Sequence, residues 1–392
     1  MITTAPYHKN GINSQEILAL ASHRSPNSIS IYLPTHRTGD EVLQSHDALA
    51  LKSKIRSVRE AFSRRGLDRQ ELSERLTPLE DLVADSGFWR RQAEGLAIFA
   101  SKTTLHIYRL SRDFEPEFRL TDTFFLLPML PLFSGGGSYY LLSLELQRIR
   151  LFEGNRNELV EIPVDDLIPD RLEDRVGTDY DQRNLQFKSQ QPKQGGATYH
   201  GHDEADRGRK EEISRFFKGV DQGIRTELNR KPLPLLIASQ DYLAALYKEA
   251  SSYGLIEEKP LICNLSQIDE TELHQLSWNA ISPAFEKPAR DKWEKFLQFN
   301  GTGKASAQTD IILAGALQER VDSLFVKQGT ELRGSFDLEK RTSKIAKDSS
   351  PFTGSLTDLA IHETLLHGGA VYPMPNAGMA GETSGMAALF RY

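Results

Sequence analysis

The chain has 392 residues, more than one hydrophobic core usually serves, so two or three domains are expected. Hydrophobic residues at 39% and charged residues at 26% indicate an ordinary globular protein, and the net charge of −6 excludes attraction to DNA or RNA over the whole surface. The single cysteine, Cys263, excludes a disulfide framework, and the absence of a leader-like start and of any apolar run of about 18 residues predicts a cytoplasmic protein without a membrane partner.

The first segment, residues 1–134, mixes helices and strands. Apolar residues recur at helical spacing in three stretches, which predicts helices at 14–21, 41–63 and 69–83. Alternating or continuous apolar runs predict strands at 28–33, 95–100, 104–109 and 123–127. Prolines and glycines from Pro128 to Gly137 then break the pattern, so we expect an α/β domain over residues 1–134.

The second segment, residues 135–300, opens with three closely spaced strands at 139–144, 148–153 and 158–162, which predict an antiparallel meander. A long loop and helix follow. The chain then alternates strand and helix, with strands at 235–238 and 260–263 and a helical pattern at 269–299. This order resembles the ribonuclease H arrangement. Cys263 lies in the last strand and is expected to be a buried structural thiol.

The third segment, residues 301–392, predicts a small α/β/α domain. Helices are expected at 309–319 and 355–366, and strands at 321–326, 370–372 and 387–390, with a polar stretch at 333–350. His362 and His367 are five positions apart and do not share a helix face, and Glu363 and Thr364 are expected on an ordinary exposed side.

The chain is organised around residues 188–228, where a polar loop from Gln194 to Glu204 leads into a long amphipathic helix. Six apolar residues recur on one face of that helix: Ile213, Phe216, Phe217, Val220, Ile224 and Leu228. The loop holds a glycine pair, two histidines and two carboxylates. A long loop of such content on a firmly packed helix is usually functional.

Four stretches resemble one known family. They are Leu151–Asn155, Gln194–Gly196 with Leu236–Ser239 beyond it, the run from Gln318 to Leu324, and the terminal run from Gly385 to Tyr392. In this order they are similar to the archaeo-eukaryotic peptide-chain release factors and their Pelota relatives, especially the bacterial branch. The resemblance covers roughly residues 136–392. It implies a ribonuclease H-like middle domain and a C-terminal domain like the kink-turn-binding ribosomal proteins.

The resemblance also implies a function in translation, with the ribosome or tRNA as partner. The family's catalytic loop carries Gly-Gly-Gln, whereas this chain has Gln194, Gly195, Gly196 and then Ala197. The expected role is therefore ribosome rescue or stress rather than stop-codon termination, and peptidyl-tRNA hydrolysis is left open. The alternative is a non-catalytic ribosome- or RNA-binding protein. A protein partner of the C-terminal domain is also considered.

The histidines of the loop suggest another reading. His200 and His202, followed by Asp203 and Glu204, have the side chains of a metal-dependent hydrolase. The two carboxylates also suit the positive end of the following helix, and no second compact cluster supplies further ligands. We therefore predict no metal and no cofactor, and keep His200 and His202 as candidate catalytic residues of the loop.

A local group of cations marks the junction of loop and helix. Arg207, Arg209, Lys210 and Arg215 are candidate contacts to RNA phosphates. Acidic residues are interleaved with them at positions 206, 211 and 212, so a mixed, solvated helix face is the alternative.

Overall fold

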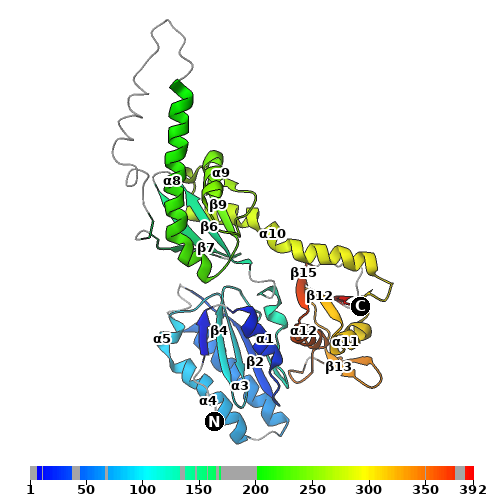
Figure 1. Ribbon diagram of the computed structural model, residues 1–392. Coiled ribbons are helices and arrows are strands. Elements are labelled where there is room, and N and C mark those ends of the chain that lie inside the picture. The colour runs from blue at the N-terminus through cyan, green and yellow to red at the C-terminus, as the bar shows by residue number, and fades with distance from the viewer. Residues whose placement is uncertain are drawn as a thin grey trace. The chain divides into compact units, whose positions relative to one another are not determined.

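The computed structural model describes residues 7–10, 12–37, 45–66, 69–132, 137–145, 148–156, 158–164, 167–168, 201–348, 350–375 and 385–392 (Figure 1). The chain forms two compact units, one of residues 1–136 with 287–392 and one of residues 137–286. The chain passes between the units at 136/137 and again at 286/287, the second time inside a helix. The domain boundaries expected at 134/135 and 300/301 stay a prediction. In the described part of the chain, no helix is both long and apolar enough to cross a membrane.

The first sheet has five strands in the order β1-β4-β3-β2-β5. Its strands are β1 (Tyr7–Asn10), β2 (Ser28–Pro34), β3 (Gly95–Ala100), β4 (Leu105–Leu110) and β5 (Glu117–Thr121). Only β1 runs parallel to its neighbour. The helices of this part are α1 (Ser14–Ser22), α3 (His46–Arg64), α4 (Arg69–Ala84), α5 (Ser86–Trp89) and the 3-10 helix η1 (Leu127–Leu132).

Both faces of this sheet are buried. Successive side chains of a strand point to opposite sides, so adjacent residues report on the two faces. On β2, Ile31 packs with α3 and α4, while the adjacent Tyr32 packs in a second cluster with Leu20 of α1. The three predicted helices and the strands predicted at 28–33, 95–100 and 104–109 are confirmed. The sheet is therefore covered by helices on two sides, as an α/β domain requires.

The strand predicted at 123–127 is wrong, because the strand of this region is β5, six residues earlier. Phe124, Phe125 and Leu126 are buried nonetheless. The amide of Phe125 donates to the Ser30 hydroxyl at 2.9 Å, and the amide of Leu126 donates to the Asp358 carboxylate at 2.8 Å. Side chains supply the hydrogen bonds that a strand would otherwise obtain from a neighbour, so an apolar run is buried without strand structure.

The sheet of residues 137–286 has the order β10-β9-β6-β7-β8. Its strands are β6 (Tyr139–Leu144), β7 (Ile149–Gly154), β8 (Leu159–Ile162), β9 (Leu235–Ser239) and β10 (Leu261–Ile262). The first three are antiparallel, and β9 and β10 continue the sheet in parallel from β6. This confirms the predicted meander and the two further strands that follow it in the chain.

Helices cover the two faces of this sheet. On one face pack α8 (Gly201–Arg230) and α9 (Asp241–Ala250). On the other packs the beginning of α10 (Glu270–Phe299), preceded by the 3-10 helix η3 (Leu265–Gln267). Cys263 packs at the edge of this second cluster and is half-buried rather than buried; burial raises the pKa of its thiol.

The helix α8 begins earlier than expected. Its backbone is helical from Gly201, so the assignment of residues 201–204 to the loop is wrong. The backbone of Asp203 and Glu204 lies in the first turn of this helix. A glycine at the first position does not interrupt a helix, because the penalty for glycine applies to helix interiors.

The C-terminal sheet has the order β11-β16-β12-β15. Its strands are β11 (Ala305–Ser306), β12 (Val321–Lys327), β15 (Ala370–Met374) and β16 (Met386–Phe390). One face packs on α11 (Thr309–Leu317) and α12 (Leu356–Leu366), and the other on the end of α10 through Trp293 and Phe296. The predicted α/β/α layering is confirmed.

One hairpin of this part was not predicted, and one expectation is wrong. The polar stretch at 333–350 contains a hairpin of β13 (Gly334–Asp337) and β14 (Thr342–Ile345). Thr364 is not exposed but fully buried, and His362 of the same helix is 1% exposed. The reason is that α12 packs on its own sheet with one side and contacts α1 and η1 with another, which leaves it no ordinary exposed side.

Candidate functional site

The structure reaches only part of the predicted site. Gln194, Gly195, Gly196, Ala197 and His200 lie outside the described residues. Three further candidates are in the helical backbone of α8 but their side chains are outside the description: His202, Arg207 and Arg209. The remaining two, Lys210 and Arg215, are exposed on α8. The loop itself therefore stays a prediction, and what the structure adds is the way in which its helix is held.

The helix α8 is held on its sheet by the predicted apolar face. All six residues of that face are buried, none more than 1% exposed: Ile213, Phe216, Phe217, Val220, Ile224 and Leu228. They pack with β6, β7 and β9 and with Tyr247 of α9. The part of α8 from Ile213 to Leu228 therefore forms a firm base for the loop that precedes the helix.

A buried carboxylate also fixes α8. Asp221 is 2% exposed and accepts hydrogen bonds from the hydroxyl of Ser251, from Arg225 Nη2 at 2.7 Å and from the backbone amide of Ser252 at 3.3 Å. Burial alone would raise the pKa of Asp221, but these hydrogen bonds outweigh it and lower the pKa. The ionised carboxylate thus joins α8 to the end of α9.

The chain that leads into the loop also packs on α8. A Cβ atom at Gly223 would lie 2.2 Å from the carbonyl oxygen of Leu167 and 2.6 Å from the side chain of Ile168. Only glycine permits this approach. Gly201, where α8 begins, is 22 residues before Gly223. At 1.5 Å per residue, the start of the helix therefore lies about 33 Å along the helix axis from this contact.

The outer face of α8 carries cations. Lys210, Arg215 and Lys218 are exposed, and none forms an ion pair with another described residue. Glu211 beside them is exposed as well. In Figure 1 the amino-terminal turns of α8 extend past the strands of the sheet. The face can meet an anionic surface such as RNA, and it equally fits the predicted alternative of a mixed, solvated face.

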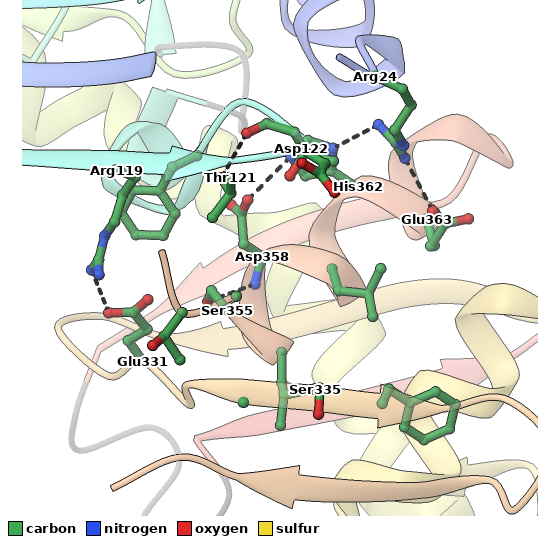
Figure 2. Close-up of a pocket in the computed structure, with 18 residues that line it drawn as sticks. Arg24, Arg119, Thr121, Asp122, Glu331, Ser335, Ser355, Asp358, His362 and Glu363 are labelled. Carbon is green, nitrogen blue, oxygen red and sulfur yellow. Dashed lines mark hydrogen bonds and ion pairs between the residues drawn. The ribbon is translucent and has the colours of Figure 1, made fainter. Parts of the chain in front are cut away.

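A second site, which the sequence did not predict, is a cavity of about 230 Å³ among β5, the hairpin β13–β14 and α12. Figure 2 shows two ion pairs at its sides and two side chains between them: Arg119–Glu331, Arg24–Glu363, Asp358 and His362. The sequence shows no motif for this site, because the two partners of each ion pair are more than 200 positions apart.

The charges of this cavity are largely paired. Arg119, 4% exposed, lies 2.7 Å from the Glu331 carboxylate and 3.2 Å from that of Glu117, with its guanidinium over the ring of Phe125. Burial raises the pKa of Glu117, and Arg119 opposes that rise. Such pairing joins two parts of the fold.

The alternative of a metal-dependent hydrolase stays a hypothesis. In the described ranges no group of three His, Cys, Asp or Glu side chains could hold a metal ion. The side chains of His200, His202, Asp203 and Glu204 are not among those described, so the geometry of that cluster is not decided.

The sequence matches one family. Residues 139–283 match bacterial archaeo-eukaryotic release factor family 7. This range contains the strands β6 to β10, the loop and α8. No curated protein matches the sequence.

Several solved structures are similar over long alignments. Archaeal translation termination factor aRF1 aligns at 12% identity over 97% of this chain and 99% of its own, with a TM-score of 0.23. Dom34 of S. cerevisiae, a translation termination-like factor, aligns at 11% identity over 67% and 64%, with a TM-score of 0.36. Pelota from Archaeoglobus fulgidus aligns at 11% identity over 99% and 94%, with a TM-score of 0.29. At these values the likeness carries no conclusion about activity.

Proposed function

We propose that this chain, whose residues 139–283 belong to family 7 of the bacterial archaeo-eukaryotic release factors, acts on ribosomes or peptidyl-tRNA in rescue or stress. The observation that carries the proposal is the family match, which spans both the Gly195–Gly196 loop and the helix that supports it. Stop-codon termination is not proposed, because Ala197 occupies the position where the release factors carry glutamine.

The support of the loop fits this role. A loop that enters a ribosomal site needs a rigid support. The helix α8 is held in place by six buried apolar residues and by the hydrogen bonds of Asp221. The exposed cations Lys210 and Arg215 lie on the same helix and can contact RNA phosphates. The ribosome or tRNA is therefore the partner that we propose.

The chemistry of the loop is limited by Ala197. A methyl group cannot align a water molecule against an ester, so any contribution must come from backbone amides and from the freedom of the glycine pair. A non-catalytic protein that occupies the ribosomal site is the second candidate, and Ala197 is the observation that favours it. The two candidates differ in peptidyl-tRNA hydrolysis.

The test measures ribosome co-sedimentation and peptidyl-tRNA hydrolysis for the parent and for a Gly195→Val, Gly196→Val double variant. Valine resists positive φ, so the double variant should lose ribosome-linked activity while its unfolding stays unchanged. Gly254→Val is the matched control, because Gly254 lies in the same unit with open space around its Cβ position. It should behave like the parent.

Two further variants separate the candidates. Ala197→Gln should confer peptide release if the loop has kept the release-factor geometry, and the parent should bind without release if it is non-catalytic. A metal-dependent hydrolase instead predicts that His202→Ala abolishes activity and that the glycine variants act weakly. Loss with His202→Ala and no loss with the double glycine variant would overturn the proposal.

A further inference from the structure

His362 of α12 lies between two carbonyl oxygens. Its Nδ1 is 2.9 Å from the carbonyl oxygen of Ala21 in α1, and its Nε2 is 2.9 Å from that of Phe124, in the segment after β5. Nε2 is also 3.2 Å from the carboxylate of Asp358. The ring is 1% exposed.

These contacts constrain the protons of the ring. A carbonyl oxygen only accepts, and a neutral imidazole donates from one nitrogen only. If Nδ1 carried no proton, its lone pair would face the oxygen of Ala21 at 2.9 Å. Arg24 Nη1 lies 3.4 Å from Nδ1, but it is 2.6 Å from that same oxygen, which is its nearer acceptor. The imidazolium, which donates from both nitrogens, satisfies the contacts with Ala21, Phe124 and Asp358, while Arg24 Nη1 keeps the carbonyl oxygens of Ala21 and His23 as its acceptors.

The charged groups around the ring are compatible with a positively charged imidazolium. On α12 itself, Asp358 faces Nε2, and Glu363 lies 3.2 Å from Arg24 Nη2. Two carboxylates therefore offset the imidazolium and the guanidinium of Arg24. At the end of α1, burial, His106 and Arg24 lower the pKa of His23, so this ring adds no charge near neutral pH. Asp122 lines the same cavity. Tyr32 is buried, and this burial raises the pKa of its hydroxyl well above the usual value.

We propose that His362 is a proton-dependent clasp: the contact of α12 with α1 and with residues 124–127 takes up one proton at this ring and weakens when the proton is lost. The same contact includes the amides of Leu126 and Leu127, which donate to Asp358 Oδ1 at 2.8 and 2.9 Å. Hydrogen exchange at these two amides therefore measures the strength of the same contact without a probe on the His362 ring. Because the clasped form binds the proton, its stability falls as the pH rises.

The first test is hydrogen exchange of the peptide that contains Leu126 and Leu127 in the full chain, at about pH 5.5 and about pH 8, which bracket the charge change of an ordinary histidine. Rates are corrected for the intrinsic pH dependence of exchange. Protection should fall with pH in the parent, by at most about tenfold per pH unit for one linked proton. In His362→Gln it should be lower and independent of pH.

The matched control is His274→Gln. His274 also places Nε2 2.9 Å from a carbonyl oxygen, that of Asn155, but it lies in the other compact unit. This variant should keep the protection of the parent and its pH dependence. Protection that is constant or rises with pH in the parent, or that falls equally in His362→Gln, would overturn the clasp.

The second test does not depend on whether His362→Gln folds. In a proton–nitrogen correlation spectrum of the parent labelled at histidine nitrogen, a clasped His362 should show two ring N–H signals near neutral pH, both slow to exchange. Assignment can proceed by replacing the other nine histidines of the chain one at a time. A single ring N–H for His362 would show that the ring is neutral and that no proton is taken up.

Discussion

Arg119 Nη2 lies 2.7 Å from Glu331 Oε2, although 212 positions separate the two residues in the chain. The pair joins β5 of the first sheet to the segment that precedes the hairpin β13–β14. Together with the Asp358 bonds to the amides of Leu126 and Leu127, it fastens the C-terminal layers to the first sheet through polar contacts. Polar contacts that bury charge are sensitive to the loss of one partner, and this makes the junction testable.

Glu331→Ala should destabilise the chain by about 3 kcal/mol, as expected when one partner of a buried ion pair is removed. Arg119 would retain Glu117, while Arg333, which lies 2.9 Å from Glu331, would also lose its partner. Urea unfolding measures the change. Glu60→Ala, which breaks the exposed pair with Arg56, is the control and should cost no more than about 0.5 kcal/mol. Equal effects of the two variants would contradict the role of the junction.

Glu117→Gln should stabilise the chain at neutral pH. Because burial raises the pKa of Glu117, the folded chain keeps this proton to higher pH than the unfolded chain. Stability is therefore lost as the pH rises from the ordinary glutamate pKa through the raised one. The variant removes that loss, and its advantage should disappear below this window. Unfolding midpoints across the acid range check the sign, with the exposed Glu115→Gln as control. A variant less stable than the parent at neutral pH would show that the contact of Glu117 with Arg119 outweighs burial.

Gly223→Ala should destabilise α8, because the added Cβ would lie 2.2 Å from the carbonyl oxygen of Leu167. Overpacking of this kind costs about 1–3 kcal/mol. Gly208→Ala on the same helix is the control, since nothing lies within 4 Å of its Cβ position, and it should stabilise by up to about 1 kcal/mol. Thermal unfolding of both variants gives the comparison. If both glycines respond alike, the close approach of residue 167 to α8 is not what holds the helix.

Deletion of residues 385–392 should unfold the C-terminal layer. The strand β16 lies between β11 and β12, and its five residues are all buried. Its removal takes ladder hydrogen bonds from both neighbours and exposes Phe325 and Leu324 on the two faces of β12. Circular dichroism and melting of the shortened chain measure the effect. Melting identical to that of the full chain would show that β16 is dispensable.

Local patterns in the sequence determined much of this fold. The buried face of α8 was predicted because apolar residues at helical spacing must share one side of a helix, whatever lies against it. The meander β6–β8 was predicted because short connections force neighbouring strands to pair. These patterns do not predict the conformation of the loop before α8. The role that we propose for the loop rests on the family match and on Gly195 and Gly196, which lie outside the described residues.

The tertiary structure alone decided the features that depend on residues far apart in the chain. Residues 123–127 look like a strand because they are apolar, but their amides bond to Ser30 and to Asp358, up to 232 positions away. Thr364 was expected on an exposed side of α12 with Glu363, yet it is fully buried beside Gly369, which precedes β15. The setting of His362 has the same origin, because the carbonyl oxygens that meet its two nitrogens belong to α1 and to the segment after β5. Periodicity reports which residues share a face, but not which distant segment will cover that face or which polar atoms it brings.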